Sequence, residues 1–116
     1  MSLRIKEGVS IRGLQPQMFH AWNVAGEVYE ESHGVDCILT AGVDGKHGRG
    51  SLHYVGFAID LRIRNLLPGW QLTPELVEAA ELVNIKLQNR LGFEYDVVLE
   101  SNHFHIEFQP KNPVGE

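Results

Sequence analysis

The chain has 116 residues, of which 43% are hydrophobic and 22% are charged, a balance that excludes a disordered chain. Its length fits a single domain over residues 1–116, and its one cysteine, Cys37, excludes a disulfide framework and an all-cysteine zinc site. A net charge of −5 disfavours general nucleic-acid binding, which depends on neutralising phosphates, so we expect no nucleic-acid partner.

The sequence carries no recognisable membrane or secretion signal. No apolar run approaches the roughly 20 residues that span a bilayer, so we expect no membrane insertion. Residues 1–13 lack the apolar core and the small-residue cleavage site of a secretory signal. We therefore expect synthesis in the cytoplasm without a signal peptide.

The first half of the chain predicts one helix and two strands. Apolar residues three or four apart predict a helix over 14–33. A short apolar, β-branched run predicts a strand over 35–43, and the glycine-rich segment 44–52 predicts a loop. Strict alternation of apolar and polar residues then predicts a strand over 58–63.

The second half predicts one helix and two further strands. A helix is predicted over 73–91, with Thr73 as its N-terminal cap. Strands are predicted over 95–99 and 103–109. The order of elements predicts an α+β domain, in which two main helices pack on one face of a mostly antiparallel sheet.

The segment SLHYVGFAID places His53 and Asp60 seven residues apart. On one straight strand this odd spacing would put the two side chains on opposite faces. Gly56 lies between them and can adopt a bend that L-residues resist, so both side chains can point to one spot. Taken alone, the pair also fits a loop histidine and an ordinary aspartate on the polar face of a strand.

The segment ESNHFH places His103 and His105 on one face of the last predicted strand, and a turn can bring the Glu100 carboxylate near them. Taken alone, the two histidines also fit the solvent side of a sheet. Together with His53 and Asp60, they supply the ligand types of an open zinc site, which has three protein ligands and a water. Glu100 is then the available general base.

These two segments resemble the motifs of a known family. SLHYVGFAID matches the SxHxxGxAxD motif of the zinc D-alanyl-D-alanine metallopeptidases, and ESNHFH is similar to their HxH motif, with a catalytic position three residues before its first histidine. The resemblance spans residues 38–108 and extends to the zinc module of the hedgehog signalling domain. It implies a hedgehog-like or D-alanyl-D-alanine peptidase-like fold.

The resemblance also implies a role for each matching residue. Zinc would be held by His53, Asp60 and His105. Glu100 would take the proton from a water at the zinc, and His103 would contact the developing oxyanion. A competing alignment with the ExxH motif of other members makes His103 the third ligand in place of His105.

Further residues are candidates for substrate binding. His47 matches a histidine of the hedgehog-like branch, and Arg49, Arg62 and Lys46 can pair with a substrate carboxylate, since peptide stems end in one. Each also fits a loop histidine or a solvated surface charge.

The function implied by the resemblance is zinc-dependent hydrolysis of peptidoglycan stem peptides. The enzyme would be a D-alanyl-D-alanine carboxypeptidase or an endolysin that cuts between L-alanine and D-glutamate, released to the cell wall by a phage lysis system. The alternatives are a non-catalytic, hedgehog-like zinc module and a phage structural or interaction protein. The combination of Glu100, His103 and His105 favours the peptidase, because a structural zinc needs no base and usually has four protein ligands.

Overall fold

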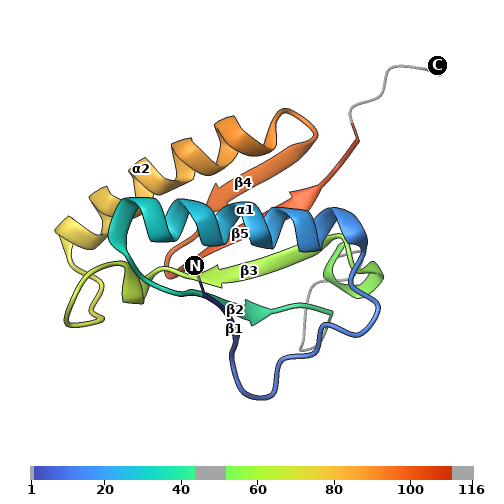
Figure 1. Ribbon diagram of the computed structural model, residues 1–116, viewed down its shortest axis with the longest axis horizontal. Helices are drawn as coiled ribbons and strands as arrows, with labels where there is room; N and C mark the ends of the chain where they lie inside the picture. Colours follow the sequence, from blue (N-terminus) through green and yellow to red (C-terminus); the bar gives the residue numbers. More distant parts are fainter. Residues whose placement is uncertain (1, 44–51, 111–116) are drawn as a thin grey trace.

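Two helices and five strands form the regular structure of the computed structural model, which describes residues 2–43 and 52–110 (Figure 1). In chain order they are β1 (Leu3–Ile5), α1 (Pro16–His33), β2 (Cys37–Ala41), β3 (Ala58–Arg62), α2 (Pro74–Leu91), β4 (Tyr95–Leu99) and β5 (His103–Phe108). Two short 3-10 turns flank β3, namely η1 (Leu52–Val55) and η2 (Arg64–Leu66). The α+β class expected from the sequence is confirmed.

The strands form one mixed sheet in the order β1-β2-β3-β5-β4. β1 runs parallel to β2, and the other neighbouring strands pair antiparallel. This corrects the expectation of a mostly antiparallel sheet. The difference comes from β1, which the sequence patterns miss because three residues are too few to show alternation. α1 supplies the crossover connection that a parallel pair needs.

The hydrophobic core lies between the two helices and one face of the sheet. The core-facing side chains of the central strands are fully buried at Ile59 and Leu61 of β3 and at Phe104 and Ile106 of β5. They join one cluster with the inward-facing residues of both helices. Because side chains alternate along a strand, the intervening residues of β3 and β5 stand on the opposite, open face.

Helix α2 begins as the sequence predicts. The Oγ1 atom of Thr73 accepts a hydrogen bond from the backbone N–H of Leu76 at 3.1 Å. Pro74 occupies the first helical position, where its missing N–H leaves no partner unsatisfied. Such a cap contributes about 1 kcal/mol to the stability of a helix.

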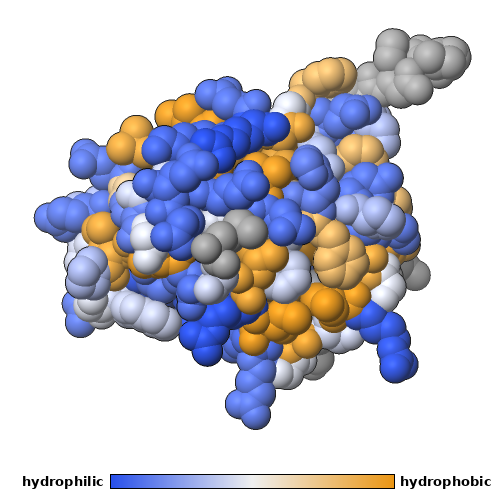
Figure 2. All heavy atoms as spheres, viewed as in Figure 1, coloured by the Kyte–Doolittle hydropathy of each residue, from blue (hydrophilic) through white to orange (hydrophobic). Residues whose placement is uncertain are grey.

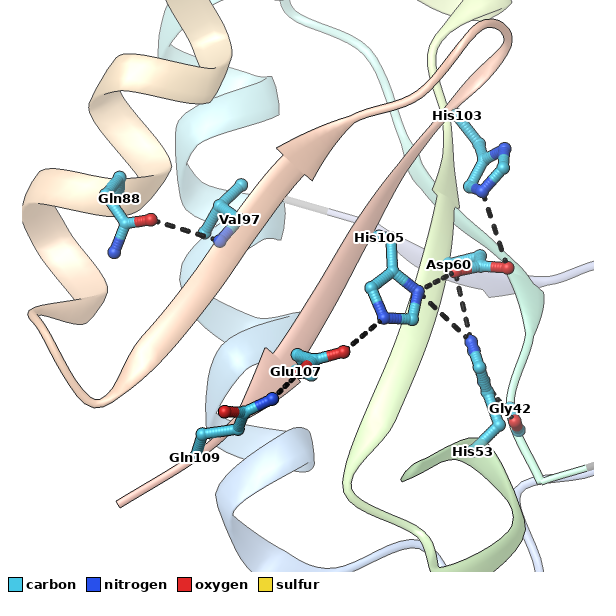
Figure 3. Close-up of polar contacts among 9 residues, drawn as sticks. All are labelled: Gly42, His53, Asp60, Gln88, Val97, His103, His105, Glu107 and Gln109. Carbon is cyan, nitrogen blue, oxygen red and sulfur yellow. Dashed lines mark hydrogen bonds and ion pairs between the residues drawn. The ribbon is translucent and has the colours of Figure 1, made fainter. Parts of the chain in front are cut away.

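Strand β4 forms one edge of the sheet, and the side chain of Gln88 covers its outer backbone groups. The Gln88 Nε2 atom donates to the carbonyls of Gly92 at 3.0 Å and Tyr95 at 2.7 Å. The Val97 N–H donates to Gln88 Oε1 at 3.0 Å, as Figure 3 shows. An open edge strand is a template for pairing with another chain. Here a helix side chain takes the place of the missing strand.

The side of the molecule seen in Figure 2 mixes hydrophilic and hydrophobic residues. Several large apolar side chains of α2 are exposed, among them Val77, Leu82 and Ile85. Neither described helix has the length and apolar character that crossing a membrane requires.

Candidate metal centre

His53 is a buried histidine held by a backbone carbonyl. It lies in η1 with 2% of its surface exposed, and its Nδ1 atom lies 2.7 Å from the carbonyl oxygen of Gly42. Since a carbonyl only accepts, Nδ1 carries the hydrogen and donates it, which leaves the lone pair on Nε2. Residue 42 must be glycine, because an added Cβ would lie 2.4 Å from the Ser10 carbonyl oxygen.

A turn at Gly56 aims His53 and Asp60 at the same point. Gly56 has a φ of +82°, in the left-handed region, and an added Cβ would lie 2.3 Å from the Gly13 carbonyl oxygen. The predicted bend between the two side chains is therefore confirmed. His53 Nε2 lies 3.2 Å from Asp60 Oδ1.

His105 meets Asp60 across the sheet. The antiparallel register of β3 and β5 places the two residues directly opposite each other, and His105 Nδ1 lies 2.9 Å from Asp60 Oδ1 (Figure 3). The register follows from the hydrophobic pattern, because a slip of β3 by one residue would expose Ile59 and Leu61 and bury Asp60.

His53, Asp60 and His105 can together hold a metal ion. Their three facing atoms form a triangle with sides of 3.2, 2.9 and 3.3 Å. A tetrahedral ion with bonds of about 2.0–2.1 Å separates neighbouring ligand atoms by roughly 3.3 Å, so the triangle has the required size. With both imidazoles neutral, a cation bound between these atoms would accept one lone pair from each of the two rings and one from the carboxylate.

Glu107 contacts the His105 ring nitrogen that does not face Asp60, and the sequence analysis did not predict this contact. Its Oε1 atom lies 2.7 Å from His105 Nε2, and Gln109 Nε2 donates to its other oxygen (Figure 3). The Nε2–H of His105 therefore donates to Glu107, which leaves Nδ1 as the metal-facing atom. A carboxylate in this place is the usual orienting partner of a metal-binding histidine. The available signal was its position two residues after His105, on the same face of β5.

The charges of the group are strongly coupled. Burial alone would raise the pKa of Asp60, but its contacts with the His105 and His53 rings outweigh burial and hold the pKa well below its usual range. The hydrogen bond with Asp60 raises the pKa of His105 to about 9 against the effect of burial, and Glu107 adds to the rise. Without a metal, a proton on His105 thus supplies positive charge where a cation would bind.

His103 lies beside this group, outside the triangle. Its Nε2 atom lies 3.7 Å from Asp60 Oδ2, and its Nδ1 donates to Asn102 Oδ1 at 2.7 Å. Within the described ranges, the group that can hold a metal contains His105 and not His103.

Glu100 lies in the turn that joins β4 to β5. Its backbone N–H donates to the His103 carbonyl at 2.8 Å, and the residue is exposed. The metal-binding group found among the described residues does not include its carboxylate.

A cleft of about 640 Å³ opens beside the metal-binding group, and Asp60, His103 and Arg62 line it. The structure thus brings one predicted substrate-binding residue, Arg62, to the site. The other candidates, His47, Arg49 and Lys46, lie outside the described residues.

Two comparisons with known proteins identify no relative. No protein-family model matches the chain, and no curated protein matches it.

Proposed function

We propose that the protein is a zinc-dependent peptidase that acts on peptidoglycan stem peptides. The observation that carries this proposal is the convergence of His53, Asp60 and His105 on one point at separations of 2.9–3.3 Å. Two imidazoles and one carboxylate form a ligand set that suits zinc, and three protein ligands leave a position open for a substrate or a water.

The motif resemblance connects this geometry with a substrate class. The converging residues occupy the ligand positions of SxHxxGxAxD and HxH in the zinc D-alanyl-D-alanine metallopeptidases. We extend the likeness to the fold of that group and of the hedgehog zinc module. The peptide bond is either a terminal D-alanyl-D-alanine bond or the bond between L-alanine and D-glutamate.

The chain's own residues would divide the work of hydrolysis. A bound zinc ion would supply a water of lowered pKa and polarise the carbonyl. Glu100 would take a proton from that water and pass it to the leaving amine. No ion pair in the described part of the chain involves the Glu100 carboxylate. His103 lines the cleft and, with a hydrogen on both ring nitrogens, would donate a hydrogen bond from Nε2 to the oxyanion.

Mass spectrometry of purified peptidoglycan after incubation with the zinc-loaded protein tests this proposal. A chelator-treated sample and Glu100→Gln serve as controls. Loss of one terminal D-alanine would identify a carboxypeptidase, and freed stem peptides with intact glycan would identify an endopeptidase. Zinc-loaded protein that releases no peptide from several wall types would contradict the proposal.

One observation favours a second candidate, a zinc-binding module without peptidase activity. Glu100 is exposed and stands apart from the group that can hold the metal. In this case the parent protein would bind zinc but release no peptide, and Glu100→Gln would behave in the same way.

A further inference from the structure

The cleft beside the metal-binding group is lined by three cationic side chains from separate elements. Lys6 follows β1, Arg62 ends β3, and Arg64 lies in η2. Asp60 and His103 line the same cleft, so it opens onto the candidate centre. Asp60 is the only carboxylate-bearing residue of its described lining.

These cations have no internal counterion in residues 2–43 and 52–110. None of the ion pairs there involves Lys6, Arg62 or Arg64. The negative charge of Asp60 is already shared with three histidines. A basic cleft therefore stands in a chain whose net charge is −5, and its potential attracts anions.

Arg62 is held in place from two sides. Its guanidinium carbon lies 5.5 Å from the centre of the Trp70 ring, and its carbonyl accepts a 2.5 Å hydrogen bond from the Tyr29 hydroxyl. Trp70 is half exposed and has a φ of +55°, a strained conformation for a residue other than glycine. Strain of this kind concentrates where a site needs a fixed geometry. Stacking fixes the guanidinium plane while leaving its N–H donors available.

The distance along β3 limits which anionic ligand can reach both the metal-binding group, at Asp60, and the guanidinium of Arg62. Asp60 and Arg62 are two residues apart on the same face, which separates their backbones by about 6.6 Å. If a substrate peptide bond lies at the metal-binding group, an anionic group bound by Arg62 would thus belong to a substrate residue within about one position of that bond. The bidentate donors of arginine match the planar shape of a carboxylate.

We propose that Arg62 and Arg64, assisted by Lys6, bind a substrate carboxylate one residue from the scissile bond. The protein would then select peptides whose carboxylate is free and reject those in which it is amidated. This inference rests on the proposed peptidase function, which it deepens by naming the chemical group that the substrate must carry.

Two dipeptides that differ in one group test the proposal. They are N-acetyl-L-alanyl-D-glutamate γ-methylamide, with a free α-carboxylate, and its α-carboxamide. Their dissociation constants would be measured by NMR titration of zinc-loaded protein carrying Glu100→Gln, which limits cleavage. The variants are Arg62→Gln, Arg62→Lys and Arg64→Gln. Lys86→Gln is the matched control, because it removes the same charge from α2, on the other side of the sheet.

We expect the free carboxylate to bind about tenfold tighter than the amide, as a charge-assisted hydrogen bond predicts. Arg62→Gln and Arg64→Gln should each reduce this preference, Arg62→Lys should restore only part of it, and Lys86→Gln should leave it unchanged. Equal affinity for the two dipeptides, or a preference that survives Arg62→Gln combined with Arg64→Gln, would overturn the proposal. Zinc affinity measured in each variant verifies that the site remains folded.

The cleavage assay separates this proposal from the one it rests on. An arginine-dependent preference in binding without any hydrolysis of peptidoglycan would retain the carboxylate site and reject the peptidase. Hydrolysis of acid and amide peptides with equal kcat/KM would retain the peptidase and reject the carboxylate site.

Discussion

Asp60 and His105 face each other across the β3–β5 ladder, with Oδ1 and Nδ1 2.9 Å apart. Two of the three converging side chains are thus placed by the register of the sheet, and the third, His53, by a short turn anchored on Gly42. The group is built on rigid elements, as a binding site of defined geometry requires.

Replacing each converging residue should remove metal binding. We expect His53→Ala, Asp60→Ala and His105→Ala to weaken zinc binding by at least about a hundredfold, because an open site has only three protein ligands. His103→Ala should retain most of the affinity. Competition with a chromophoric chelator measures each constant. Loss of zinc in His103→Ala with retention in His105→Ala would support the competing alignment.

Glu107→Gln should weaken zinc binding about 10- to 100-fold, the usual effect of removing an orienting carboxylate. The amide keeps the shape of the side chain and removes its negative charge. In the parent protein, that charge stabilises the ring of His105 in its metal-facing orientation. Glu81→Gln makes the same charge change on α2 and should have no effect. An unchanged zinc constant in Glu107→Gln would show that the 2.7 Å contact has no orienting role.

Glu100→Gln should keep zinc and lose activity. The amide cannot accept the proton, so we expect turnover to fall by about 10²-fold or more, which is the range of general base catalysis. Zinc content and peptide release would be measured on the same preparation. Equal peptide release by the variant and the parent protein would remove Glu100 from the mechanism.

Gln88→Leu should destabilise the fold. The side chain satisfies three backbone groups, and each lost hydrogen bond costs about 1 kcal/mol. We expect the free energy of unfolding, measured by urea titration, to fall by about 2–4 kcal/mol. Gln88→Glu keeps the acceptor for the Val97 N–H and should lose less. A change below about 0.5 kcal/mol in Gln88→Leu would contradict this role.

Stability should decrease at alkaline pH. Burial raises the pKa of the Cys37 thiol far above its ordinary value of 9.0 and raises that of Tyr29 well above 10.0. Above pH 9 the unfolded chain therefore loses protons that the folded chain keeps, so rising pH favours unfolding. Each group contributes a slope of about 1.4 kcal/mol per pH unit.

The contribution of Cys37 can be separated by substitution. Cys37→Ala should reduce the slope of unfolding free energy between pH 9 and 10, where the thiol in the unfolded chain is ionised to a greater extent than the Tyr29 phenol. Urea unfolding at several pH values measures the slope. Identical slopes in the parent protein and the variant would show that the thiol ionises equally in both states.

Sequence patterns predicted most of the elements because they are long or strictly alternating. The helix predicted over 73–91 corresponds to Pro74–Leu91, and the strand over 95–99 to Tyr95–Leu99. The bend at Gly56 was predictable as a possibility, because glycine can adopt a conformation that brings His53 and Asp60 to one point despite their odd spacing.

The missed features depend on tertiary contacts. β1 is too short for a periodic signal, and its pairing with β2 is set by the return of α1. Glu107 fits any polar position of an alternating strand, and its role becomes visible only from its contact with His105. The cleft joins Lys6 to Arg64, which are far apart in the sequence, so no local motif links them.

The short β1 strand has a consequence for dynamics. It is held at the sheet edge through β2, and the Lys6 N–H adds one hydrogen bond to the Leu39 carbonyl at 2.9 Å. Terminal edge segments open at low free-energy cost, and such opening would withdraw Lys6 from the cleft. A ligand that contacts Lys6 must therefore slow amide hydrogen exchange along β1, which makes this strand a local reporter of occupancy in the neighbouring cleft.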